Sequence, residues 1–246
     1  MDEIKRFQDE KKTRIKKQGE PGALKNAAMQ FTEESIQSGY SYNFSWMGRP
    51  IIQYPQDMVI MQELIWDIKP DLIIETGIAH GGSLIYYASM LELIGKGEVL
   101  GIDIDIRAHN RKEIESHPLF KRIRMIEGSS VSPEVVEQVR DFASGKHRIM
   151  VCLDSNHTHD HVLKELNAYS PFVTKGSYLI AFDTIVEDLA KNAAPDRPWA
   201  KGNNPKTAVW EFLKSNDEFI IDMDIDNKLL ISVAPQGYLK RVKSPS

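Results

Sequence analysis

Short apolar runs alternate with helical patterns along most of this chain. The strand candidates are residues 71–75, 98–104, 122–126, 148–153, 177–182, 218–223 and 228–233. The helical patterns between most of them cover residues 83–94, 109–116, 132–143, 158–168 and 206–214. The first five strand candidates are nearly continuous apolar runs, which is typical of parallel strands covered by helices on both faces. The pattern therefore predicts an α/β fold with a seven-stranded, mostly parallel sheet.

The last two strand candidates differ from the first five in how they are connected. The sequence between them, Asp-Ile-Asp-Asn at 224–227, has the composition of a turn. We expect residues 218–223 and 228–233 to form an antiparallel hairpin at one edge of the sheet. Residues 187–206 are rich in Pro, Asn, Ala and Lys and show little periodicity, so they predict a long loop or lid.

The N-terminal part of the chain has a different character, and we treat residues 1–50 as an extension of a main domain at 51–246. Residues 1–20 carry seven Lys/Arg and five Asp/Glu, which suits a solvated helix or a disordered arm; a partner-binding or lid helix is the alternative. Residues 29–50 are rich in aromatic residues without a clear period and predict a loop lying on the body. Pro55 starts a helical pattern that ends at Lys69-Pro70.

Composition narrows the class of protein. The chain has 246 residues, 41% of them hydrophobic, and a formal net charge of −4, which does not favour non-specific nucleic-acid binding. A single cysteine, Cys152, excludes an intrachain disulfide and suits a reducing compartment. No apolar run reaches the roughly 20 residues of a membrane helix, and the N-terminus is too charged for a signal peptide. We expect a cytoplasmic protein with no integral membrane segment.

The run from Asp71 to Ser83, DLIIETGIAHGGS, contains the clearest candidate site. An apolar strand ends in Glu75, a glycine-rich turn follows, and a helical pattern opens at Ser83. Free N–H groups and the helix dipole converge at such a junction and favour a charged ligand. The turn lacks the dinucleotide and phosphate-loop fingerprints. It suits a zwitterion such as S-adenosylmethionine, with Gly77 and Gly81 letting the backbone approach, Ser83 binding a carboxylate and Glu75 an ammonium.

Two further loops complete the predicted ligand site. The second strand ends in Gly-Ile-Asp-Ile-Asp, where Asp103 is placed to accept hydrogen bonds from ribose hydroxyls and Asp105 is better suited to a helix cap or to solvent. The third strand is followed by Glu-Gly-Ser-Ser at 127–130. There we expect Gly128 and Ser130 beside an adenine ring, with a plain turn as the alternative.

Polar residues after the fourth and fifth strands predict the part of the site where the reaction takes place. Asp154 and Asp183 end adjacent strands, so their carboxylates should lie in one cleft, where they can bind a hard cation such as Mg²⁺ or titrate at separated pKa values. His157 is the candidate general base. His157, His159 and His161 together raise the alternative of a zinc site, although only the first and last share a helix face.

Taken together, these residues resemble the cephalosporin hydroxylase family, which includes rhamnosyl and other sugar O-methyltransferases. The resemblance runs from about residue 46 to residue 242. It is carried by WMGRP at 46–50, PQD at 55–57, KPDLIIETG at 69–77, GGS at 81–83, GIDID at 101–105, LDSNH at 153–157, GSYL at 176–179 and GYLKR at 237–241.

The resemblance implies a class I methyltransferase fold and S-adenosylmethionine-dependent methylation of a hydroxyl on a sugar or secondary-metabolite-like molecule. By position, Glu75, Gly77, Ser83 and Asp103 would bind the donor, and Asp154 and Asp183 would bind Mg²⁺. Residue 182 departs from the family pattern, because Phe stands where a carboxylate is usual, which should weaken metal binding. A non-catalytic carbohydrate-binding protein and a Rossmann dehydrogenase are the competing hypotheses. The oligomeric state stays open, with the aromatic segment a candidate for packing between subunits.

Overall fold

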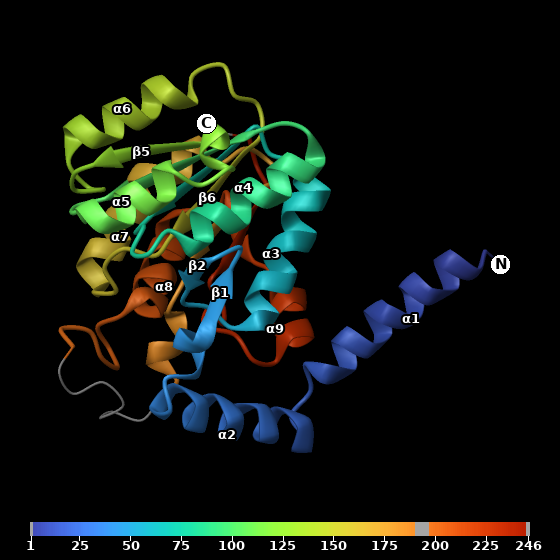
Figure 1. The fold of residues 1–246 in the computed structure, drawn as a ribbon. Coiled ribbons are helices and arrows are strands. Elements are labelled where there is room, and N and C mark those ends of the chain that lie inside the picture. The colour runs from blue at the N-terminus through green and yellow to red at the C-terminus, as the bar shows by residue number, and fades with distance from the viewer. Residues whose placement is uncertain (1, 190–196, 245–246) are drawn as a thin grey trace.

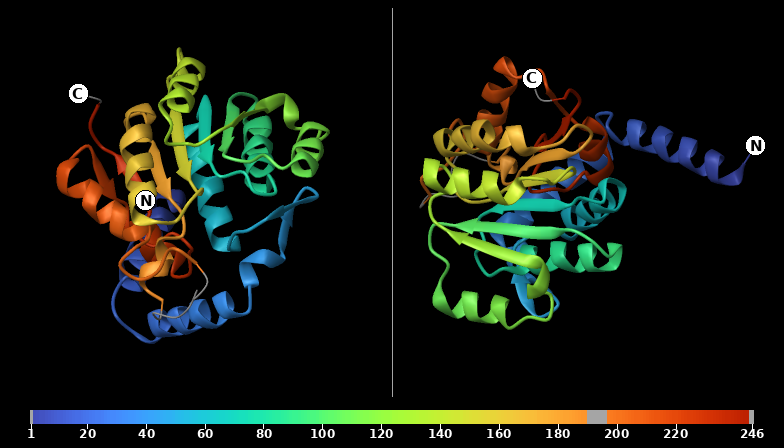
Figure 2. Two further views of the ribbon diagram at one scale, coloured as in Figure 1. Left: turned by 90° about the vertical axis from the view of Figure 1, so that its left-hand side faces the viewer. Right: turned by 90° about the horizontal axis from the view of Figure 1, so that it is seen from above.

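The computed structural model describes residues 2–189 and 197–244 and shows a seven-stranded sheet between two layers of helices (Figures 1 and 2). The strand order is β5-β4-β3-β6-β7-β9-β8. The first five strands in the chain are parallel, and β9 is antiparallel to both of its neighbours. The strands are β3 (Leu72–Thr76), β4 (Glu98–Asp103), β5 (Ile123–Glu127), β6 (Ile149–Leu153), β7 (Tyr178–Ala181), β8 (Phe219–Ile221) and β9 (Tyr238–Arg241).

Each face of the sheet is covered by its own set of helices. One face packs against α3 (Pro55–Ile68), α4 (Gly82–Ile94) and α5 (Ala108–Glu115). The other packs against α6 (Pro133–Ala143), α7 (His159–Tyr169) and α8 (Pro205–Ser215). Because both faces are covered, β3 and β6 are buried along their whole length, which explains their continuous apolar runs. The predicted fold class and its five parallel strands are confirmed.

The predicted hairpin at the sheet edge is wrong in its second strand. Residues 224–227 lie inside a helix, α9 (Met223–Leu229), and the partner of β8 is β9. Strand β9 is not predicted from the sequence, because two of its four residues, in Tyr-Leu-Lys-Arg, are basic and a buried strand is usually apolar. Arg241 is nevertheless buried, since its guanidinium donates to the carbonyls of Ser170 and Val173 and pairs with Glu218. An internally bonded arginine can therefore occupy a core position.

The aromatic segment is also more ordered than the predicted loop. It comprises α2 (Ala23–Gln37), a 3₁₀ turn η1 (Tyr40–Asn43) and a short hairpin of β1 (Phe44–Trp46) and β2 (Arg49–Ile51). The buried face of α2 consists of Ala28, Thr32 and Ser35, small residues that a search for large apolar side chains does not detect. The hairpin lies against the body, where the Trp46 indole donates to Ser89 and packs edge-to-face on Tyr86.

The charged N-terminal region forms a helix, α1 (Glu3–Gln18), that projects from the body (Figure 1). None of its residues is buried. The remaining 3₁₀ turns are η2 (Phe120–Arg122), η3 (Ser170–Phe172) and η4 (Thr184–Glu187). The predicted lid at 187–206 falls partly outside the described residues, which resume at Arg197.

Candidate active site

A pocket of about 530 Å³ opens at the carboxyl ends of β3, β6 and β7. Parallel α/β sheets bind ligands at this edge. Five of the predicted site residues line it: Gly77, Ser83, Asp154, His157 and Asp183. The other predicted residues, Glu75, Gly81, Asp103, Gly128 and Ser130, are not part of its lining.

The turn after β3 is shaped by close packing as well as by any ligand. Gly77 has φ +92°, and a Cβ there would lie 2.1 Å from the carbonyl oxygen of Asp154. A side chain at position 77 would therefore push the β3 and β6 loops apart. Gly81 and Gly82 are also closely packed, because a Cβ would lie 2.4 Å from the Ile114 side chain and 2.1 Å from the carbonyl oxygen of Pro50, respectively.

Glu75 and Ser83 contact each other at the start of α4. The Ser83 hydroxyl donates to Oε2 of Glu75 at 2.6 Å. Glu75 is fully buried, and loss of water raises the pKa of its carboxyl to about 8, against the opposing effects of the Ser83 and Tyr87 hydroxyls. Its second oxygen, Oε1, has no hydrogen-bond partner in the described part of the chain. This orphan acceptor fits a ligand with hydrogen to donate.

Asp103 stabilises the turn after β3 from the neighbouring strand. Its Oδ2 accepts from the amide of Ile78 at 2.8 Å and that of Ala79 at 3.3 Å, and its Oδ1 accepts from the amide of Asp105 at 3.1 Å. The side chain of Asp105 is exposed, as expected. Asp103 thus holds the ligand turn in place, and its role toward a ribose stays a prediction.

The loop after β5 turns away from the pocket. Ser130 is buried, and its hydroxyl donates to Oε1 of Glu165 at 2.6 Å and lies 3.2 Å from Nε2 of His161. The Gly128 amide donates to the Asp103 carbonyl at 2.8 Å, which joins this loop to the end of β4. Because the hydrogen of the Ser130 hydroxyl goes to Glu165, the hydroxyl is left as an acceptor toward an adenine, and that contact stays a prediction.

Asp154, His157 and Asp183 come together at the floor of the pocket. One ligand atom from each lies within 4.8 Å of the other two. Nε2 of His157 is 3.1 Å from Oδ2 of Asp183. Burial and the nearby charge of Asp183 raise the pKa of the Asp154 carboxyl well above its usual range. This is the juxtaposition that the strand order predicts.

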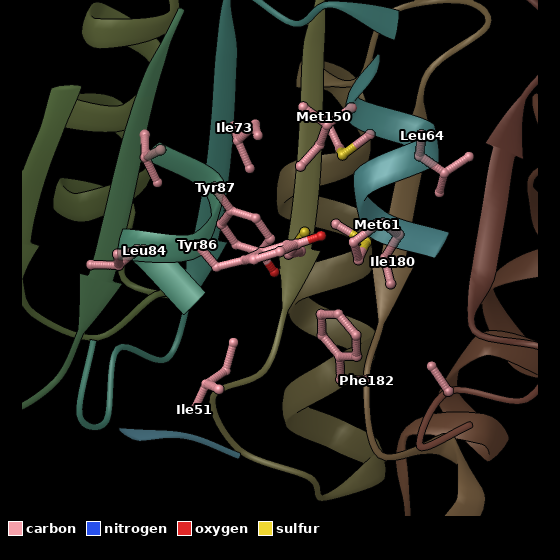
Figure 3. Close-up of a cluster of buried hydrophobic side chains, with 14 of the residues drawn as sticks. Ile51, Met61, Leu64, Ile73, Leu84, Tyr86, Tyr87, Met150, Ile180 and Phe182 are labelled. Carbon is pink, nitrogen blue, oxygen red and sulfur yellow. The ribbon is translucent and has the colours of Figure 1, made fainter. Parts of the chain in front are cut away.

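Asp183 has a backbone conformation that few side chains adopt. Its φ is +54° and its ψ +23°, in the left-handed region that Asp and Asn tolerate best among residues with a side chain. Left-handed residues other than glycine often mark functional sites. The neighbouring Phe182 does not reach the pocket floor, because its ring is buried among Met61, Tyr86 and Tyr87 (Figure 3).

The three histidines do not form a common metal site. His159 contacts Thr207 at 2.8 Å and Glu211 at 3.2 Å, and His161 lies 3.2 Å from Ser155. Among the described residues, the candidate metal group contains only His157 of the three. The zinc alternative is therefore not supported by their placement.

Sequence reasoning missed the aromatic neighbour of His157. The Trp199 ring lies 4.8 Å from the imidazole at an interplanar angle of 81°, and the Arg197 guanidinium lies 5.1 Å over the indole. Both side chains line the pocket. The composition of residues 187–206 predicts a loop, but it does not indicate which strand end this loop reaches.

The sheet order, the pocket at the carboxyl ends of its strands and the acidic floor define a class I methyltransferase-like protein. The family model for rhamnosyl O-methyltransferase/CmcI matches residues 38–242, and the chain belongs to this family. It is similar to the rhamnosyl O-methyltransferase of Mycobacterium tuberculosis, at 32% identity over 220 residues that cover 85% of this chain and 84% of the relative. The Mycobacterium leprae protein of the same name is 30% identical over 200 residues, 80% of this chain and 82% of its own. The chain is an S-adenosylmethionine-dependent O-methyltransferase.

Solved structures share the fold. CmcI in an apo form and CmcI with Mg and S-adenosylmethionine both superpose with a TM-score of 0.59, at 20% and 22% identity, each covering 82% of this chain and 78% of that one. An O-methyltransferase from Bacillus cereus in complex with S-adenosylhomocysteine gives 0.52 at 13% identity, over 91% and 92% of the two chains. Within the described residues, no helix combines the length and the apolar character needed to cross a membrane.

Proposed function

We propose that this chain methylates a hydroxyl group of a sugar, with His157 as the general base. The observation that carries the proposal is the cluster of Asp154, His157 and Asp183 at the floor of a pocket whose other end reaches Ser83 at the start of α4. A donor bound at α4 and an acceptor above the floor would meet inside one cavity. The rhamnosyl O-methyltransferase relatives support a sugar as the acceptor.

His157 is suited to remove the hydroxyl proton. A neutral imidazole can accept a proton near pH 7, and proton transfer by a placed base contributes about 10²–10⁴-fold to the rate. The carboxylate of Asp183, 3.1 Å from Nε2, stabilises the positive charge that the ring then acquires. The methyl donor supplies a methyl group on a sulfonium; the acceptor oxygen forms the new C–O bond as the C–S bond breaks, and S-adenosylhomocysteine leaves.

The floor also fits a divalent cation. Asp154 and Asp183 offer the carboxylate oxygens that Mg²⁺ prefers. The pKa of Asp154 is raised first by burial and then by the nearby charge of Asp183, and a cation would offset both effects. Bound Mg²⁺ would orient the acceptor hydroxyl and lower its pKa. Phe182 adds no ligand, so we propose a weakly bound metal held by these two carboxylates.

Trp199 supports a carbohydrate acceptor over a small aromatic one. Sugars present faces of C–H groups that pack well on indole rings, and Trp199 is part of the pocket beside the base. Arg197 covers the ring and adds hydrogen-bond donors at the same place. An aromatic surface with flanking donors is well suited to orient one sugar hydroxyl toward His157.

The test is a transfer assay with purified protein. Calorimetry with S-adenosylmethionine and S-adenosylhomocysteine establishes donor binding, and mass spectrometry then follows a gain of one methyl group on rhamnosides and other glycosides. Donor binding with transfer supports the proposal. Donor binding without transfer to any glycoside would contradict the sugar acceptor and favour a different hydroxyl substrate or a binding protein.

A further inference from the structure

Two buried oxygen atoms near the start of α4 accept no hydrogen bond from the described residues: Oε1 of Glu75 and Oε1 of Gln53. Glu75 is 0% and Gln53 is 7% exposed. A buried oxygen without a donor costs about 1–3 kcal/mol. Gln53 lines the main pocket, and Glu75 is hydrogen-bonded to Ser83, which lines the same pocket. Two orphan acceptors connected to one pocket in this way point to a ligand group that carries several hydrogens.

Ser83 connects Glu75 to the cavities that Gln53 lines. It donates to the other oxygen of Glu75 at 2.6 Å, and it lines the main pocket together with Gln53. Gln53 and Ser83 also line a small cavity beneath the pocket, whose other wall includes Tyr86 and Tyr87. Figure 3 shows the rings of Tyr86 and Tyr87 in this region, in front of the strands. Gln53 therefore lines both cavities together with Ser83, the hydrogen-bond partner of Glu75.

The backbone that follows Gln53 is anchored at two residues. The neighbouring Tyr54 is buried, and its hydroxyl is 2.6 Å from Oγ of Ser35 on α2. Asp57, in the first turn of α3, accepts from Ser232 at 2.6 Å and from Tyr238 at 2.7 Å. With these anchors the Gln53 amide is held at the pocket, so its orphan oxygen is a built feature of the site.

The orphan oxygens and the start of α4 together indicate which ligand group binds here. An ammonium offers three N–H donors, enough for both orphan oxygens. The first N–H groups of α4 have no partner within the helix and favour an anion beside them. An ammonium group next to a carboxylate is the head group of an α-amino acid. The raised pKa of Glu75 agrees with a buried acid that lacks its cation.

We propose that Gln53, from the segment between β2 and α3, accepts a hydrogen bond from the α-ammonium of the methyl donor and completes an ammonium site with Glu75. This assignment rests on the donor site proposed above and adds a residue from outside the β3–α4 turn. It makes donor affinity depend on the N-terminal hairpin and on the anchors of Tyr54 and Asp57.

The experiment compares two ligands by calorimetry. S-adenosylhomocysteine has the amino-acid head, whereas 5′-methylthioadenosine lacks it. Gln53→Met keeps the length of the side chain and removes the amide. We expect it to weaken S-adenosylhomocysteine by about 10- to 100-fold, the effect of one hydrogen bond to a charged group, and to leave 5′-methylthioadenosine within about twofold.

A second variant identifies the atom involved. Gln53→Glu keeps an acceptor and loses the N–H donor, so it should bind S-adenosylhomocysteine more tightly than Gln53→Met does. If it binds more weakly, Gln53 donates to the ligand's carboxylate and the ammonium assignment is wrong. Gln56→Met is the matched control, because its Oε1 is also a buried orphan but its side chain does not line the pocket; it should change neither affinity.

The outcomes separate this inference from the proposed function. If the unaltered protein binds neither nucleotide, the donor site itself is wrong. If it binds both and Gln53→Met weakens them equally or not at all, the donor site stands and the role of Gln53 is refuted. Binding of 5′-methylthioadenosine by each variant also shows that the variant is folded.

Discussion

Nε2 of His157 lies 3.1 Å from Oδ2 of Asp183, which joins the loop after β6 to the end of β7. The two strands are neighbours in the sheet, so the contact follows from the topology. It places a negative charge beside the imidazole that would become positive if His157 acts as the proposed base. The same carboxylate also faces Asp154, so Asp183 links the base to the candidate metal site.

The first prediction concerns the base. His157→Ala should lower kcat for sugar methylation by about 10²–10⁴-fold, because it removes the group that accepts the hydroxyl proton. Affinity for S-adenosylhomocysteine, measured by calorimetry, should stay the same. His159→Ala is the matched control, since His159 contacts Thr207 and Glu211 away from the pocket, and it should keep its activity. Equal activity of the two variants would refute the assignment of the base.

The second prediction concerns the metal. Asn tolerates the left-handed backbone at position 183, so Asp183→Asn should fold normally while losing a charged ligand. We expect its affinity for Mn²⁺, followed by electron paramagnetic resonance, to fall at least about tenfold, since one of only two carboxylate ligands is removed. Glu211→Gln is the control at an exposed acid next to His159. Unchanged Mn²⁺ affinity in Asp183→Asn would exclude this residue as a ligand.

The third prediction concerns the acceptor. Trp199→Ala should raise the KM for a glycoside acceptor by about tenfold or more, because a buried aromatic contact of this size is worth at least about 1.4 kcal/mol. Donor affinity should not change. Trp210→Ala is the control, because its indole donates to Gln236 at 2.9 Å and does not line the pocket. A change in donor affinity with no change in acceptor KM would contradict the proposed surface for the sugar.

The sequence is sufficient to predict the fold where the local pattern and the sheet topology agree. Apolar runs predicted β3 to β7, and an acid at the end of each of β6 and β7 placed Asp154 and Asp183 together because parallel neighbours end at one edge. It was not sufficient where burial depends on long-range bonding. The strand containing Arg241 looks exposed until Ser170, Val173 and Glu218 are brought to it.

For the site, too, residues in a local motif could be predicted, and residues brought in from distant segments could not. The β3 turn could be identified from its own residues, but Gln53 and Trp199 could not, since each reaches the pocket from a segment with no motif. Ser130 was suggested by its place in the chain alone. The structure adds that its hydroxyl donates to the buried carboxylate of Glu165, which is distant in sequence, and its contact with a ligand stays a prediction.

The fourth prediction concerns pH and Glu75. Its pKa is about 8 in the folded chain and near 4.5 when unfolded, so between these values the folded state binds the extra proton. The free energy of unfolding should therefore fall as pH rises from 5 to 8, by up to about 1.4 kcal/mol per pH unit from this group. In Glu75→Gln, chemical denaturation across this range should show a shallower decline. Equal slopes for the two proteins would mean that Glu75 is ionised in the folded state.

The last prediction concerns α1. Residues 2–10 are all exposed, including Ile4 at 72% and Phe7 at 56%, so this half of the helix buries little apolar surface against its own chain. Removing residues 1–10 should shift the melting temperature by less than about 2 °C and leave donor affinity unchanged.

Light scattering on the same pair of proteins tests whether α1 packs against a second copy. A lower mass for the shortened chain would show that the helix joins subunits; an equal mass with a large drop in melting temperature would show that it stabilises its own body, contrary to its exposure.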